Sequence, residues 1–298
     1  MGVMHTMKDF LRSKNSANIM YIPALILFAV FVAFPLFNGL RIAFTNWNGF
    51  SSEYSYVGAK NFIALFTDKN FYRALRNTMI YGFGSTLFQQ LLGLSYALLF
   101  NKAFRGRTFG RVMIYLPVLI APVIMGYMYY FFFQYNYGAL NDILVLLGFE
   151  KLDWLASGDR SVMIITGVNT LQYCGVSMII YLAGLQGISK TYYEAADIDG
   201  ATTSQQFFNI TLPMLYPAIV SSVTFNLIGG LKLFDAIKAL TAGGPGYSSH
   251  SLSTLIDYAY FRNQTAGYSS AMGIILFFII MIISLSLQLY MKSREVEY

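Results

Sequence analysis

The sequence predicts an all-α integral membrane protein with six transmembrane helices. Of its 298 residues, 56% are hydrophobic and only 11% are charged, whereas soluble domains carry about a quarter charged residues. Six apolar stretches are long enough to cross a hydrocarbon core of about 30 Å, which takes roughly 20 helical residues. No long linker or low-complexity segment divides the chain, so we expect one transmembrane domain over residues 1–298.

The six predicted spans are joined by short connections. The first could be mistaken for a signal sequence, but it is too long and lacks a small-residue cleavage site, so we keep it as a helix. Prolines inside spans should kink them and expose backbone groups that a neighbour or a cavity must satisfy. The spans cover residues 19–44, 78–100, 112–133, 162–185, 212–234 and 269–291, and the prolines in or at the start of them are Pro23, Pro35, Pro117, Pro122, Pro213 and Pro217.

Basic residues in short loops predict the orientation of these spans. Cytoplasmic loops of membrane proteins are enriched in Lys and Arg, and both the N-terminal segment and the connection between the second and third spans are basic. Six spans then return the C-terminus to the cytoplasm, although the first external loop is also rather basic. The cytoplasmic residues used here are Lys8, Arg12, Lys14, Lys102, Arg105, Arg107, Arg111, Lys292 and Arg294.

The segment between the fourth and fifth spans predicts a short helical elbow, residues 189–211, on the cytoplasmic surface. Thr191-x-x-Glu194 matches a capping box at a helix start, and Gly200 would end that helix. Thr203-x-x-Gln206 offers a second capping box, and Pro213 can open the long apolar helix that follows. Neither short helix can cross a bilayer, so we interpret the elbow as a docking element presented to a partner in water.

Several functions are disfavoured by the sequence. The net charge of +6 is explained by residues that flank the spans, so nucleic-acid binding is not expected. Ser189 stands where a phosphate-binding loop requires glycine, so this chain should not hydrolyse ATP. His5 and His250 lack a metal-ligand pattern, and Cys174 reads as a buried structural thiol. No catalytic motif stands out, so we expect neither an enzyme nor a cofactor or metal bound to this chain.

Transport remains, and polar residues within the spans indicate a pathway. Asn169, Gln172 and Tyr173 recur at helical spacing on one face of the fourth span, and Asn226 lies about midway along the fifth. Interhelical hydrogen bonds that only brace the bundle are an equally good explanation for each residue. Acids and bases are missing from the centre of most spans, which argues against a proton or ion relay. Uncharged amides and aromatic rings suit a neutral, polyhydroxylated ligand.

The elbow sequence also resembles a known family. Glu194-Ala195-Ala196, Gly200 and Ile210-Thr211-Leu212-Pro213 are similar to the signature of the membrane subunits of binding-protein-dependent ABC importers. Further stretches resemble the carbohydrate branch, in particular the first permease subunit of the maltose and glycerol-phosphate type. These stretches are Leu240 to Pro245, Asn77-Thr78 opening the second span, Leu116-Pro117 in the third and Asn169-Thr170 opening the fourth.

The resemblance implies a type I importer permease fold in a bacterial or archaeal cytoplasmic membrane, with both termini inside. It implies a second homologous permease, two cytosolic ATPase subunits that carry ATP and Mg²⁺, and an extracytoplasmic sugar-binding protein. The substrate would be a sugar, and an oligosaccharide is expected. A secondary carrier or channel for a neutral polar solute is the alternative function. The docking residues implied by the motif are Glu194, Ala195, Ala196, Asp197, Gly200, Ile210, Leu212 and Pro213.

Overall fold

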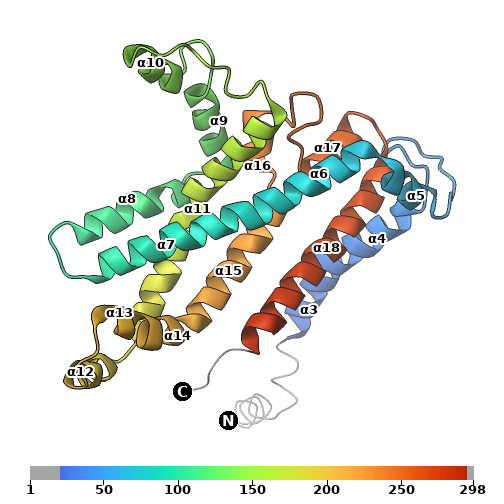
Figure 1. Ribbon diagram of the computed structural model, residues 1–298. Coiled ribbons are helices and arrows are strands. Elements are labelled where there is room, and N and C mark those ends of the chain that lie inside the picture. The colour runs from blue at the N-terminus through green and yellow to red at the C-terminus, as the bar shows by residue number, and fades with distance from the viewer. Residues whose placement is uncertain (1–20, 294–298) are drawn as a thin grey trace, which may run out of the picture.

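The computed structural model describes residues 21–293, which fold into a bundle of long helices (Figure 1). Four helices are long and apolar enough to span a membrane, and each of two bent helix pairs could form one further span. The all-α prediction is therefore confirmed, with four to six candidate spans. Within the described range, β pairing is limited to one antiparallel bridge between Thr45 and Tyr56. The residues His5, Lys8, Arg12, Lys14 and Arg294 lie outside the described residues.

The first span is a continuous helix of 22 residues. It consists of α3 (Ile22–Phe28), a π-helical turn (Ala29–Ala33) and α4 (Phe34–Ala43). Pro35 follows the π-helical turn directly, where the wider backbone gives its ring room. None of the most apolar residues of this helix is buried, so most of its surface outside the contact with α18 is left for lipid or for another chain.

The second span begins earlier than predicted. Asp68 accepts a hydrogen bond from the Asn70 amide at 2.8 Å and starts α6 (Lys69–Met79). The helix runs on through a π-helical turn (Ile80–Gly84) into α7 (Ser85–Asn101), for 33 residues in all. Asn77-Thr78 therefore lies inside this helix and does not open it. Hydropathy missed the first turns because one face carries basic side chains and only the other is apolar.

The prediction of one helix over residues 112–133 is wrong. The third span is a pair, α8 (Arg107–Leu119) and α9 (Pro122–Phe132), whose axes meet at 99°. Ile120 and Ala121 between them are extended, because a residue before proline avoids the helical conformation and Pro122 has no N–H to donate. Pro117 remains within α8.

The fourth span, α11 (Gly158–Gly187), has 30 residues. It is longer than predicted at both ends, so Asn169-Thr170 lies near its middle and does not open it. The elbow follows as α12 (Lys190–Ile198) and α13 (Thr203–Gln206).

The fifth span begins after a bend. A π-helical turn (Phe207–Thr211) and α14 (Leu212–Met214) continue from the elbow and meet α15 (Tyr216–Leu231) at 63°. Pro217 stands in the first turn of α15, so it opens the long helix in place of Pro213. The elbow is thus part of the approach to the fifth span.

Four short helices gather at the end of the bundle opposite the elbow (Figure 1). The last span, α18, returns from this end, and its final turn lies at the same end as the elbow. The elements at this opposite end are α5 (Lys60–Thr67), α10 (Ala139–Leu146), α16 (Asp235–Leu240) and α17 (Leu252–Phe261), and α18 covers Ala266–Lys292.

Glycines set the closest helix crossings in the bundle. A Cβ on Gly93 of α7 would lie 2.3 Å from the Ser177 Cβ of α11, and one on Gly230 of α15 would lie 2.9 Å from the Gly82 Cα. Gly175 of α11 faces the α8 backbone, where a Cβ would lie 2.6 Å from the Ile114 carbonyl oxygen. Small residues allow such close approach between membrane helices.

We expect Gly175→Ala to destabilise the protein by about 1–3 kcal/mol, because the new methyl group meets backbone that cannot move independently. The measurement is the melting temperature of the purified transporter in detergent.

Gly167→Ala is the matched control. Gly167 lies on the same helix, and a Cβ there has no neighbour within 4 Å, so alanine should be neutral or slightly stabilising. Equal melting temperatures for the two variants would contradict the proposed α8–α11 contact.

Candidate functional site

The first helix of the elbow starts two residues earlier than the sequence predicted. Ser189, not Thr191, is the N-cap of α12, and its hydroxyl accepts a hydrogen bond from the Thr191 amide at 3.4 Å. Glu194 is consequently not part of a capping box. Its side chain is exposed on the surface of α12, where it is available to a partner.

The second capping box is displaced by one residue. Thr202 caps α13, and the Gln205 side chain accepts a hydrogen bond from the Thr202 amide at 2.8 Å. The prediction of Thr203 with Gln206 is wrong in register. Both pairs match the motif equally, so the sequence alone could not choose between them.

Gly200 ends α12 as predicted. Its φ is +75°, a left-handed conformation that a side chain disfavours. The Gly200 amide donates to the Asp197 carbonyl at 3.1 Å, and the Ala201 amide donates to the Ala196 carbonyl at 2.9 Å. This hydrogen-bond pattern is a Schellman motif, so the glycine reverses the chain between the two elbow helices.

Two side-chain contacts tie the halves of the elbow together. The Gln206 amide donates to the Asp197 carboxylate at 2.5 Å, and the Tyr193 and Thr211 hydroxyls lie 2.9 Å apart. Asp197 is therefore engaged inside the elbow.

Other elbow residues face outward. Glu194 and Ala195 are exposed, and Ile198 is 86% exposed at the last turn of α12. The sequence analysis did not select Ile198, although an isoleucine between two aspartates in a short helix indicates an exposed apolar contact residue. The remaining motif residues, Ala196, Ile210, Leu212 and Pro213, are half-buried.

A cavity of about 360 Å³ lies between the second, fourth and fifth spans. It brings together Asn169 and Tyr173 of α11 with Asn226 of α15, which are three of the four residues that the sequence analysis named for a pathway. Its walls also include aromatic and aliphatic groups. The full lining is Gln89, Asn169, Tyr173, Phe225, Asn226, Ile228, Gly229, Gly230, Lys232, Leu233, Phe234 and Asp235.

The two asparagines also connect helices. The Asn169 side-chain amide donates to the Ser85 hydroxyl at 2.9 Å, and the Asn226 amide donates to the Ser177 hydroxyl at 2.7 Å. Both asparagines are buried. They line the cavity and link the helices around it, so bracing and lining are not alternatives at these positions.

Gln172 does not line this cavity. Its side-chain amide approaches the Ile120 carbonyl at 3.5 Å, at the break between α8 and α9. On an ideal helix Gln172 and Tyr173 are about 100° apart, so one can face the break while the other faces the cavity. The i, i+3, i+4 spacing of Asn169, Gln172 and Tyr173 therefore does not bring all three side chains to the cavity.

Gln89 is a cavity residue that the sequence reading missed. Its side chain is 1% exposed and donates to the Asn169 carbonyl at 3.0 Å. The side-chain carbonyl oxygen of Gln89 has no hydrogen-bond partner among the described residues. The adjacent pair Gln89-Gln90 in the middle of an apolar span indicates a polar contact inside the bundle, because buried amides require hydrogen-bond partners.

Polar side chains of α6 and its continuation hold the loop that precedes α17. The Asn77 amide donates to the Ser248 and His250 carbonyls at 2.7 and 3.0 Å, and the Tyr81 hydroxyl donates to the Ser249 carbonyl at 2.8 Å. These bonds join segments about 170 positions apart and fix the loop against the second span.

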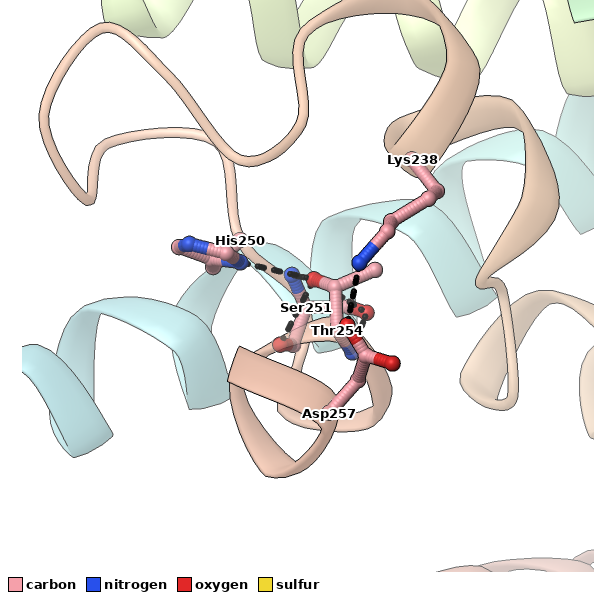
Figure 2. A network of polar contacts seen from close by, with 5 residues as sticks. All are labelled: Lys238, His250, Ser251, Thr254 and Asp257. Carbon is pink, nitrogen blue, oxygen red and sulfur yellow. Dashed lines mark hydrogen bonds and ion pairs between the residues drawn. The ribbon is translucent and has the colours of Figure 1, made fainter. Parts of the chain in front are cut away.

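A compact polar network joins the end of this loop to α16 and α17 (Figure 2). Lys238 forms an ion pair with Asp257, and the His250 ring lies 3.0 Å from the Thr254 hydroxyl. Ser251 caps α17 in a capping box with Thr254. Burial lowers the pKa of His250 to about 4, with the nearby Lys238 charge acting in the same direction. The imidazole is therefore neutral at physiological pH and serves as a packed hydrogen-bonding group.

His250 also explains why residue 243, the first of the Gly243-Gly244-Pro245 turn, is a glycine. Gly243 has a φ of +90°, and a Cβ there would lie 2.1 Å from the imidazole Cε1. Glycine is required at this position because the ring fills the space beside it.

Among residues 21–293, no group of three or more His, Cys, Asp and Glu side chains could hold a metal ion. Cys174 is buried as a free thiol.

Comparison with known proteins agrees with the family that the elbow residues predicted. The family described as the binding-protein-dependent transport system inner membrane component matches residues 89–295. The multiple sugar-binding transport system permease protein MsmF of Streptococcus mutans is 34% identical over 272 residues, which cover 91% of this chain and 92% of the relative. The trehalose/maltose transport system permease protein MalF of Thermococcus litoralis is 30% identical, with 91% of each chain covered.

A solved structure agrees with this assignment. A chain from a bacterial ABC transporter that imports the acidic polysaccharide alginate superimposes with a TM-score of 0.82 and 25% identity, covering 97% of this chain and 99% of that one. The importer fold predicted from the elbow is confirmed, and the family's role is that of a transport subunit, not an enzyme. The chain belongs to the inner-membrane permease components of binding-protein-dependent ABC importers.

Proposed function

We propose that this chain is one of two permease subunits of a sugar importer and that the cavity between the second, fourth and fifth spans is part of the sugar pathway. The cavity carries the proposal, because Asn169, Tyr173 and Asn226 offer hydrogen bonds to hydroxyls and Phe225 offers a flat apolar surface. Relatives named for multiple sugars, for trehalose and maltose and for alginate support the substrate class.

The elbow is the proposed contact with the ATPase subunits. Two cytosolic ATPase chains would bind ATP and Mg²⁺, and one would grip α12 through exposed Glu194, Ala195 and Ile198. The internal ties of the elbow support this role, because a rigid element can transmit a displacement to α14 and α15. A second permease and an extracytoplasmic sugar-binding protein would complete the assembly.

The proposed orientation places the elbow and both termini in the cytoplasm. Lys102, which follows α7, lines a second cavity together with Tyr193 and Thr203 of the elbow. The basic connection after α7 is thus at the elbow end, where α18 also ends with Lys292 (Figure 1). Enrichment of basic residues on one side supports a cytoplasmic location for that side.

Single cysteines test this orientation. In a Cys174→Ser background, cysteines at Ser52 and Ser157 should react with an impermeant thiol reagent in intact cells, and cysteines at Ser189 and Ser204 should react only after permeabilisation. All four serines are exposed. We avoid Ser249, which is fully buried. Labelling at Ser189 or Ser204 in intact cells would reverse the orientation.

The elbow role predicts loss of ATPase binding in two variants. Gly200→Val forces a branched side chain into a left-handed conformation that costs roughly 1–2 kcal/mol, and Ile198→Ser removes the most exposed apolar group of α12. Both should reduce copurification of the ATPase and sugar uptake at normal membrane levels of the permease.

Gly187→Val and Leu146→Ser are the controls. Gly187 also has open space around a Cβ but no positive φ. Leu146 is 85% exposed and is the last residue of α10, which lies at the opposite end of the bundle (Figure 1). Undiminished copurification with both elbow variants would remove the docking role.

The pathway role predicts different effects at adjacent residues. Tyr173→Leu should lower uptake by about ten-fold or more, because a lost hydrogen bond to a sugar hydroxyl costs roughly 1–3 kcal/mol. Gln172→Leu should lower the melting temperature, because the Ile120 carbonyl loses its partner, without changing which sugars are transported. Uptake of competing oligosaccharides and melting of the purified complex provide the two measurements. Normal uptake by Tyr173→Leu would argue against the pathway.

A further inference from the structure

The cavity ends in two charged residues on the side away from the elbow. Lys232 is the C-cap of α15, and Asp235 is the first residue of α16. Both line the cavity, with Leu233 and Phe234 between them in the sequence. The rest of the lining is uncharged, so these two side chains determine the charge of the cavity mouth.

Neither charge is neutralised by another part of the described chain. The ion pairs found among residues 21–293 are Arg76 with Asp159 and Lys238 with Asp257. Lys238 is near in sequence, but its ammonium group is directed to Asp257 (Figure 2) and lies 5.9 Å from the centre of the Phe234 ring. One positive and one negative charge therefore remain at the mouth.

Asp235 is half-buried and Lys232 is exposed, and both lie beside apolar side chains. Ile228, Leu233 and the two phenylalanines form low-dielectric walls next to Lys232 and Asp235, and clefts of this kind strengthen charge interactions. For an acidic saccharide, repulsion from Asp235 offsets attraction to Lys232, and for a cationic amino sugar the two effects are reversed, so neither sign of charge gains a net attraction. An uncharged saccharide meets neither repulsion and can hydrogen-bond to both groups.

We propose that Lys232 and Asp235 form a charge-balanced mouth that restricts the cavity to uncharged saccharides. This inference rests on the proposed sugar pathway. The similar alginate importer handles an acidic polysaccharide, so the shared fold alone does not fix substrate charge. Particular side chains must do so, and these are the charged residues that line the cavity.

The test is direct saccharide binding to the purified transporter, assembled with its second permease and ATPase subunits and without the sugar-binding protein. That protein must be absent because its own selectivity would mask that of the cavity. The probes are maltotriose, a uronic-acid trisaccharide and a glucosamine trisaccharide, measured by saturation-transfer NMR. The wild type should bind maltotriose best.

Asp235→Asn should raise binding of the uronic-acid probe by about ten-fold or more, because removal of a like charge relieves a strong repulsion. Lys232→Gln should do the same for the glucosamine probe. Each change is read as the ratio of charged-probe binding to maltotriose binding within the same variant, because an amide retains hydrogen bonding to hydroxyls but carries no charge.

Asp257→Asn and Lys238→Gln are matched controls that remove the same charges outside this cavity, and neither should alter the preference. An unchanged preference in Asp235→Asn and Lys232→Gln would overturn the charge-balanced mouth while the sugar pathway stands. A wild type that prefers a charged probe would also overturn it. Absence of binding by all three probes, together with normal uptake by Tyr173→Leu, would overturn the pathway itself.

Discussion

Every backbone amide and carbonyl inside a bilayer must find its partner within the protein, and this constraint shapes the whole bundle. Long helices satisfy it locally, so only the breaks need outside help. At the break after α8, the Ile120 carbonyl faces the Gln172 amide. At the end of the fifth span, the Leu233 carbonyl accepts the Ser251 hydroxyl at 2.8 Å. In each case a side chain distant in sequence supplies the partner that the helix cannot.

The same constraint places polar side chains around the cavity. Glycines bring α7, α11 and α15 close together, and the asparagines on two of these helices reach serines on a neighbouring helix. Where the helices diverge beyond these contacts, a cavity remains with amides on its walls. The proposed sugar pathway and the bracing of the bundle thus draw on the same residues, because both depend on hydrogen bonds from buried amides.

The elbow separates its internal contacts from its outer surface. Ser189, Thr202 and the Asp197–Gln206 bond satisfy the helix ends and tie α12 to α13. Glu194 and Ile198 take no part in that network and face outward. The π-helical turn and α14 lead from the elbow to the 63° bend before α15, so the elbow is joined to one wall of the cavity through a single bend.

Much of this protein could be predicted from its sequence. Hydropathy identified the membrane class and the approximate spans, since burial in lipid requires long apolar runs. The elbow motif and Gly200 indicated the importer family and the chain reversal, because a left-handed turn needs glycine locally. Asn169, Tyr173 and Asn226 were recognised as intramembrane polar groups for the same kind of reason: each feature depends on the residue itself and its near neighbours.

Tertiary structure decided what depends on contacts between distant segments. Apolar runs do not reveal that Pro122 breaks the third span by 99° while Pro117 remains within its helix, because neighbouring segments must satisfy the freed backbone. Helical spacing placed Gln172 beside Tyr173, but the position of α8 directs the glutamine to the break and away from the cavity. Gln89, Lys232 and Asp235 join one cavity only because α7, α11 and α15 pack together, and a one-dimensional pattern does not contain that packing.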